Sequence, residues 1–123
     1  MKNKERLIRK MKNAVEDLQP YSYEEFREKL PALVDRSYSF GLLDTIFTKR
    51  TGKSLKDYFN QRKLEKASEL IEQYHLTALE VAYQLGFKSI SAMIKTITDL
   101  HRSISTDIIA NLQRQFGSML PAM

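Results

Sequence analysis

The side chains that most often do chemistry in enzymes are scarce in this 123-residue chain. It contains no cysteine, which excludes thiolate zinc sites, redox motifs and cysteine nucleophiles. Its two histidines, His75 and His101, are far apart and lack carboxylates at ligand spacing, so we expect no metal site. No glycine-rich phosphate loop occurs, and no serine is accompanied by a plausible base. The sequence therefore predicts a protein with no enzymatic site and no cofactor.

The chemically useful side chains that remain are mainly cationic. Lys and Arg number 20 against 15 Asp and Glu, which gives a formal net charge of +5 and a pI near 9.5. Residues 1–20 carry six bases and three acids, and residues 49–66 carry seven bases and two acids. This excess suits a nucleic-acid partner, because each neutralised phosphate releases condensed counterions. Many small soluble domains are mildly basic, so charge alone leaves the partner open.

The basic N-terminus is not a signal peptide, because it lacks an uninterrupted apolar stretch and a small-residue cleavage site. No run approaches the ~18 apolar residues that a membrane span requires. We expect a soluble, cytoplasmic protein with no membrane partner. Its amphipathic first helix is expected to pack on the core rather than on a membrane surface.

The elements that must position the cations are predicted to be helices. The chain has only four Gly and three Pro, no hairpin signal and no sustained period-two alternation. Capping boxes at Ser22–Glu25 and Thr77–Glu80 predict helix starts, and Gly52 and Gly86 predict helix ends. We predict an all-α fold of seven or eight helices, with two helix-turn-helix units joined by a long connecting helix.

The predicted organisation has five segments. They are an N-terminal amphipathic helix packed on the core (1–20), a first helix-turn-helix unit (21–53), a connecting helix (54–75), a second unit with a terminal helix (76–116) and a frayed tail (117–123). Pro31 is expected to kink or interrupt its helix. The buried stripe of the following helix is expected at Leu42, Leu43, Ile46 and Phe47, and the apolar side of the connecting helix is expected to extend to Tyr74.

Two helix starts, at Ser39 and Ser89, lie 50 residues apart and share a pattern. Ser39, Leu43 and Phe47 correspond to Ser89, Met93 and Ile97. Each predicted helix follows a shorter one across a tight turn, and the connecting helix lies between them. The pattern indicates a duplicated helix-turn-helix unit. The alternative is coincidence, because amphipathic helices often share serine caps and apolar stripes.

The segment Thr51–Ser91 carries more specific features. Thr51-Gly52 forms a turn, with Phe47 five positions before Gly52, and Val81-Ala82-Tyr83 precedes Leu85-Gly86-Phe87. Further matching positions are Tyr58, Arg62, Leu64, Ala67, Leu70 and Ile71. With these features, roughly residues 38–108 resemble the DNA-binding domain of the AraC/XylS family of bacterial transcription regulators. In the most specific block, Ala82 is small where two helices pack closely and Gly86 takes a turn conformation that a side chain resists.

The resemblance implies DNA contacts, because family members with two such units insert both recognition helices into successive major-groove segments. On the first recognition helix the implied contacts are Gly41, Asp44, Thr45, Thr48 and Lys49. On the second they are Ser89, Ile90, Ser91, Ala92, Ile94 and Lys95. Candidates for phosphate and groove contacts are Lys49, Arg50, Lys53, Arg62, Lys88 and Lys95. The helix N-termini at Ser54 and Ser105 are expected to add backbone donors to phosphate.

Several positions depart from the family pattern. Neither outer face offers Arg or Gln, and Asp44 repels phosphate unless it accepts from a cytosine amine. Ile97 replaces an aromatic residue, Ser105 stands where proline is common, and the usual glycine is absent near His101-Arg102. The segment from Pro31 to Tyr38 differs from the expected spacing. These departures affect sequence-specific binding rather than the fold.

The leading hypothesis is a transcription regulator that binds double-stranded DNA. The alternative is a protein-interaction module on a helix-turn-helix scaffold that has lost base-specific binding and contacts RNA polymerase or another regulator. A third reading is the C-terminal part of a longer regulator. No small-molecule effector is expected, because only about 37 residues precede the matching segment.

Overall fold

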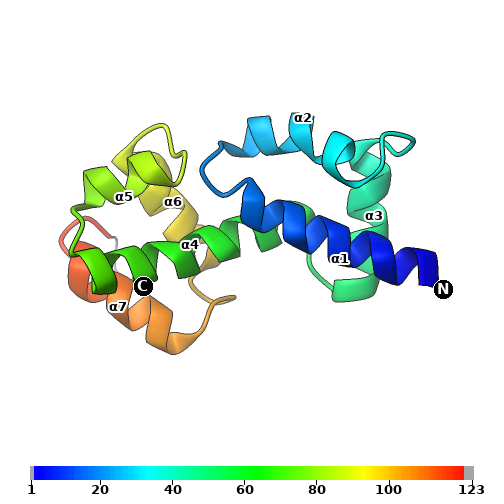
Figure 1. Ribbon diagram of the computed structural model, residues 1–123. Helices are drawn as coiled ribbons and strands as arrows, with labels where there is room; N and C mark the ends of the chain where they lie inside the picture. The colour runs from blue at the N-terminus through cyan, green and yellow to red at the C-terminus, as the bar shows by residue number, and fades with distance from the viewer. Residues whose placement is uncertain (1, 121–123) are drawn as a thin grey trace. The chain divides into compact units, whose positions relative to one another are not determined.

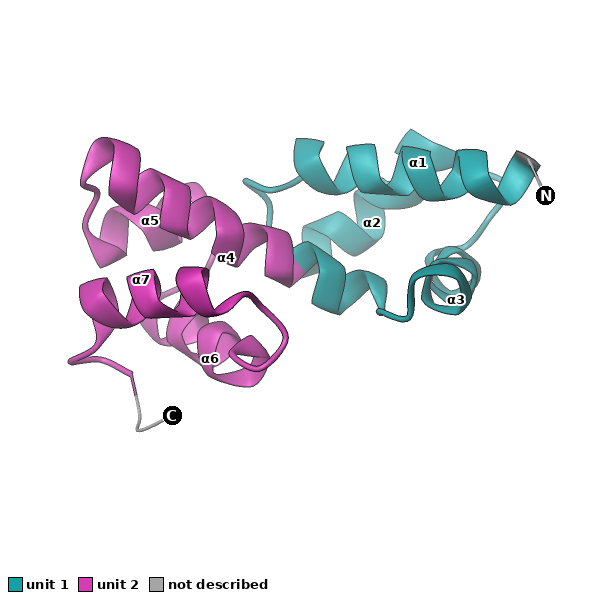
Figure 2. Cartoon of the chain, turned by 90° about the horizontal axis from the view of Figure 1, so that it is seen from below, with its two compact units in different colours: residues 1–59 teal, residues 60–123 magenta. Residues whose placement is uncertain are grey.

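The computed structural model describes residues 2–120, which form seven α-helices and no strand (Figure 1). The helices are α1 (Lys2–Asp17), α2 (Tyr23–Val34), α3 (Phe40–Thr51), α4 (Leu55–Tyr74), α5 (Ala78–Gln84), α6 (Ile90–Leu100) and α7 (Thr106–Phe116). The all-α prediction is confirmed. The chain divides into two compact units, residues 1–59 and 60–123, and the boundary falls within α4 (Figure 2).

The core of unit 1 is built around aromatic side chains from α2, α3 and the start of α4. Phe26 stacks on Phe59, with ring centroids 4.2 Å apart and an interplanar angle of 15°. Phe47 of α3 contacts Tyr58, with ring centroids 5.2 Å apart. α1 covers this cluster with an apolar face formed by Leu7, Met11, Ala14, Val15 and Leu18. Burial of these side chains holds α3 against the unit.

Unit 2 has its own core, formed by α4, α5, α6 and α7. Its buried members include Leu64, Ala67, Ile71, Val81, Ala82, Leu85, Met93, Ile97, Leu112 and Phe116. One buried polar contact lies beside them, where Asn111 Nδ2 of α7 donates to Ser68 Oγ of α4 at 2.7 Å. The two predicted recognition helices, α3 and α6, therefore pack on separate cores.

The local helix signals operate as predicted. Both capping boxes form, at Ser22–Glu25 and Thr77–Glu80. The backbone N–H and the hydroxyl of Thr77 donate to the Glu80 carboxylate and hold its pKa below its ordinary value. Gly52 and Gly86 have left-handed φ values of 78° and 74°, which place both glycines where a side chain is disfavoured.

The helix pairs α2–α3 and α5–α6 are joined by links of the same length. α3 begins at Phe40 and α6 at Ile90, each after a five-residue link, 35–39 and 85–89. α2 is 12 residues long and α5 only seven, so the extra residues lie at the start of α2 and leave the link unchanged.

Other local expectations need correction. α2 continues through Pro31, so the expected interruption is wrong; Asp35 N–H still bonds to Pro31 O at 2.9 Å and closes the last turn. Tyr74 is 64% exposed at the last residue of α4. In the predicted frayed tail, Leu120 packs on the unit 2 core and its N–H bonds to Phe116 O at 3.2 Å. Residues 121–123 lie outside the described residues.

Candidate nucleic-acid interface

The outer face of α3 gathers most of the residues predicted for the first recognition helix. Ser39 caps the helix by accepting from Leu42 N–H at 3.1 Å. Leu43 and Phe47, four residues apart, are completely buried and set the rotation of the helix about its axis. The exposed side then carries Gly41, Leu42, Thr45, Thr48, Lys49 and Arg50. The expected burial of Leu42 is wrong, because the Leu42 side chain lies in one helical row with the exposed Thr45 and Lys49. Their spacing of three and seven residues in the sequence could have indicated this.

Asp44 is placed differently from the other α3 candidates. It is half-buried, and its Oδ1 accepts from Leu55 N–H at 2.8 Å. Leu55 is the first residue of α4, where backbone N–H groups have no partner within the helix. The carboxylate also lies at the positive end of the α4 dipole. Asp44 thus caps the next helix, and this reduces its capacity to repel phosphate.

The outer face of α6 presents fewer of its predicted residues. Ser91 and Lys95 are exposed one turn apart, whereas Ile90 and Ile94 are half-buried and pack on the unit 2 core. Ala92 is half-buried, and its N–H donates to the capping Ser89 Oγ at 3.0 Å.

Lys95 Nζ forms an ion pair with Asp99 Oδ2 at 2.9 Å, and the two side chains are 77% and 59% exposed. The sequence reasoning missed Asp99, although its position four residues after Lys95 predicts such a pair. The pair partly cancels the positive charge of the α6 outer face.

The remaining predicted cations differ in their surroundings. Lys88 is exposed in the link before α6, and Lys53 is half-buried after α3. Arg62 Nη1 contacts Glu65 Oε1 at 2.6 Å. Arg62 also lines an open hollow of about 340 Å³ whose other charged residues are Glu65, Glu69, Glu72 and Asp107. These carboxylates make that surface unfavourable for phosphate.

A lysine supports the link in each helix-turn-helix unit. In unit 2, Lys63 of α4 is 2% exposed; its Nζ donates to Leu85 O and lies 5.7 Å from the centroid of the Phe87 ring. In unit 1, Lys10 Nζ of α1 donates to Val34 O at 3.5 Å from an exposed side chain. Both ammonium groups meet carbonyls at the C-terminal end of a helix, where a cation is stabilising.

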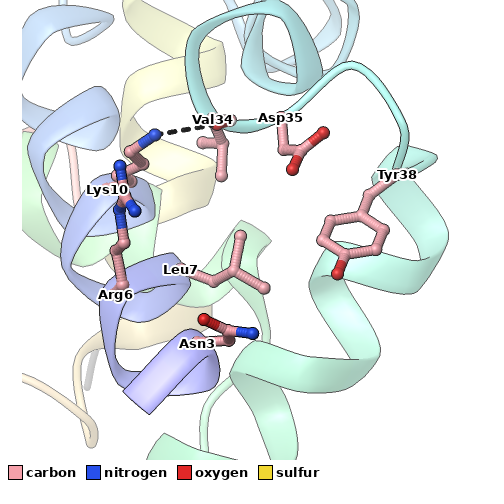
Figure 3. A pocket seen from close by; sticks show the side chains of 7 residues that line it. All are labelled: Asn3, Arg6, Leu7, Lys10, Val34, Asp35 and Tyr38. Atoms are coloured by element: carbon pink, nitrogen blue, oxygen red, sulfur yellow. Dashed lines mark hydrogen bonds between the residues drawn. The ribbon is translucent and has the colours of Figure 1, made fainter.

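The two links differ in how well their side chains fill the space beside Lys10 in unit 1 and beside Lys63 in unit 2. Leu85 and Phe87 of the second link pack on the unit 2 core. In the first link, Asp35 Oδ1 instead accepts from Ser37 N–H and Oγ at 2.9 and 2.5 Å, which lowers the Asp35 pKa. A pocket of about 280 Å³ remains there, lined by Asn3, Arg6, Leu7, Lys10, Val34, Asp35 and Tyr38 (Figure 3).

Residues 2–120 contain neither a candidate membrane span nor a candidate metal site. No helix in this range is both long enough and apolar enough to cross a membrane. Within the same range, no group of three or more His, Asp or Glu residues is arranged to hold a metal ion.

Comparison with known proteins identifies the type of domain. A family model described as a helix-turn-helix domain, of the AraC type, matches residues 37–104. The match covers more than half of the chain and contains α3, α4, α5 and α6. Searches of curated proteins and of solved structures found no match.

Proposed function

Because the chain belongs to the AraC-type helix-turn-helix family, we propose that it is a bacterial transcription regulator that binds double-stranded DNA with α3 and α6 in the major groove. The proposal includes no catalytic activity, no cofactor and no small-molecule effector, and it assigns the protein to the cytoplasm.

The observation that carries the proposal is the charge and exposure of α3. Lys49 and Arg50 are exposed in its last turn, and residues 45–56 contain no acidic residue. The one acid of α3, Asp44, is engaged at the start of α4. An α-helix fits the width of the major groove, and the cations of this outer face suit the flanking phosphates.

The proposed surface of unit 2 is smaller. It consists of Lys88, Ser91 and Lys95, with Ile90, Ala92 and Ile94 as partly covered neighbours. Lys53 is proposed for phosphate contact beside α3. Asp44, Ser89 and Arg62 are left out of the proposed contacts, because their polar groups cap helices or bond to Glu65.

The test begins with selection of bound fragments from a library of the source genome, at two salt concentrations. We expect recovery of a defined motif and a steep loss of affinity in salt, because phosphate contacts release counterions. A motif spanning two groove segments would indicate that both units read DNA, and one spanning a single segment would assign reading to one unit. No enrichment above random duplex at either salt concentration would contradict the proposal.

Charge-reversal variants locate the contact surface. Lys49→Glu and Lys95→Glu should each weaken binding to the selected duplex by about tenfold or more, because a phosphate contact is lost and a repulsive charge is introduced. Lys66→Glu is the matched control, since Lys66 is exposed on α4 and its reversal changes the net charge equally. Equal losses in all three variants would indicate a non-specific charge effect.

A second candidate function is a protein-interaction module that contacts RNA polymerase or another regulator. The observation that favours it is the exposure of three large side chains in unit 2: Tyr74, Leu79 and Tyr83 are 64%, 64% and 83% exposed. A protein partner recovered with the full chain and lost with Tyr83→Ala, together with absent or salt-insensitive DNA affinity, would favour this function over the first.

A further inference from the structure

Leu42 is a large apolar side chain on the face of α3 that the proposed function assigns to DNA. It is 46% exposed and shares a row with Thr45 and Lys49, three and seven residues later. A single exposed leucine is common on protein surfaces and carries no inference alone. Its neighbours give this leucine meaning.

Gly41, immediately before it, is a glycine that the fold does not require. Its φ is not positive, and an added Cβ would meet nothing nearer than Ser39 Oγ at 4.0 Å. Glycine inside a helix lowers helix stability relative to alanine. The absent side chain leaves the outer backbone of the first turn of α3 open to close approach by a partner.

The hydroxyl groups of this face are engaged within the helix. Thr45 Oγ1 donates to Gly41 O at 3.0 Å, and Thr48 Oγ1 donates to Asp44 Oδ1 at 3.4 Å. Residues 40–48 contain no Arg, Lys, Asn or Gln that could form a two-pronged hydrogen bond with a base. From residue 41 to residue 48 the exposed face consequently offers mainly methyl groups.

Charges at both ends of α3 indicate what meets this apolar strip. Arg36 is exposed in the link before the helix, and Lys49 and Arg50 are exposed in its last turn. A cation-flanked apolar strip complements a polyanion that carries methyl groups between its phosphates. In the major groove of DNA that methyl group is the 5-methyl of thymine.

We propose that α3 reads thymine through its 5-methyl group, with Leu42 and Thr45 making the apolar contacts and Gly41 permitting close approach. The inference rests on the proposed DNA-binding function and adds the base that the first recognition helix selects. It also accounts for base reading by a helix whose exposed face has no Arg or Gln from residue 41 to residue 48.

The test uses the duplex of highest affinity from the genomic selection. Each thymine is replaced in turn by deoxyuridine, which removes the methyl group and keeps the base-pairing edge. We expect one or two positions to lose about three- to fivefold in affinity, the scale of one buried methyl group. Equal affinity for every deoxyuridine duplex, or a selected site without thymine, would overturn the inference while leaving DNA binding intact.

Leu42→Ala then assigns the contact. In this variant the difference between thymine and deoxyuridine should disappear at the sensitive position. Leu33→Ala is the matched control, because Leu33 is 52% exposed on α2 and undergoes the same truncation. Persistence of the difference in Leu42→Ala, or its loss in both variants, would overturn the assignment. If no duplex is selected and Leu42→Ala instead disrupts a protein complex, both the inference and the proposed function are wrong.

Gly41→Ala provides a readout in which stability and binding change in opposite directions. The melting temperature should rise, because alanine favours the helix and the structure has room for its Cβ. Affinity for the thymine duplex should fall severalfold, because the added methyl group holds α3 away from the groove. Unchanged affinity in a more stable protein would contradict the close approach.

Discussion

Asp44 in α3 and Asp99 in α6 are the acidic residues of the two proposed recognition helices, and they have different partners. Asp44 accepts from Leu55 N–H at the start of α4 and from Thr48 Oγ1 of its own helix. Asp99 pairs with Lys95 on the exposed surface of α6. In two units with the same link length, the placement of one carboxylate leaves α3 with a cationic face and α6 with a nearly neutral one.

The scaffolds of the two units differ in a second way. Lys10 and Lys63 are 53 residues apart. Each is followed by buried apolar residues one and four positions later, Met11 and Ala14 after Lys10, and Leu64 and Ala67 after Lys63. Lys63 is buried beneath its link, whereas Lys10 is exposed beside an open pocket. Both units thus place a lysine against the link between their two helices, but the lysine is buried in unit 2 and exposed in unit 1.

The largest expected effect tests this difference in depth. Lys63→Ala should destabilise unit 2 by about 2–4 kcal/mol, because it removes a buried stem and leaves the Leu85 carbonyl without this donor. Lys10→Ala, its counterpart, should change the stability of unit 1 by less than about 1 kcal/mol, because its contact is long and exposed to water. Hydrogen exchange resolved by residue measures each unit separately. Similar losses in both variants would remove the distinction.

Asp44→Ala tests the capping role of the first carboxylate. The variant should lose about 1 kcal/mol of stability, the usual cost of removing a helix cap. Its DNA affinity should stay equal or increase, since a negative charge near the outer face is removed. Thermal unfolding and a binding titration measure the two quantities. A stable variant with weaker DNA binding would instead make Asp44 a base contact.

Asp99→Asn tests the exposed carboxylate of the second helix. Removal of this charge should raise DNA affinity by about two- to threefold at low salt, consistent with the small energy of an exposed helical ion pair. Glu69→Gln, an exposed site on α4, is the control for the change in net charge. A gain in Glu69→Gln as large as in Asp99→Asn would show that the α6 pair has no specific effect.

The smallest effect concerns acid stability at the start of α5. The pKa of Glu80 is lower in the folded protein than its ordinary value near 4.5, so ionisation of this carboxylate stabilises the fold at neutral pH. That contribution should be lost as the pH falls from 4.5 through the lowered pKa. Glu80→Gln should show less acid destabilisation of unit 2 in unfolding measured from pH 6 to pH 3. An unchanged pH profile would contradict the contribution of this capping box.

Local sequence patterns predict the helices and most of the candidate recognition surface. Caps such as Ser39 and Ser89 and boxes such as Thr77–Glu80 act over three or four residues, so their outcome is decided locally. The buried pair Leu43 and Phe47 likewise follows from helical spacing. The same periodicity predicts the exposed row of α3. Leu42 was wrongly expected to be buried because leucine is apolar, although its position in the helical repeat lies on the exposed side.

Which polar groups remain available on that surface depends instead on contacts between residues far apart in the sequence. Asp44 meets Leu55 N–H across 11 residues and Lys63 meets Leu85 O across 22, so neither contact is visible in a local pattern. Such pairs form when packed cores bring helix ends together, and a buried helix end requires a hydrogen-bond partner. Helix packing thereby removed Asp44 from the candidate DNA surface and buried one of two corresponding lysines.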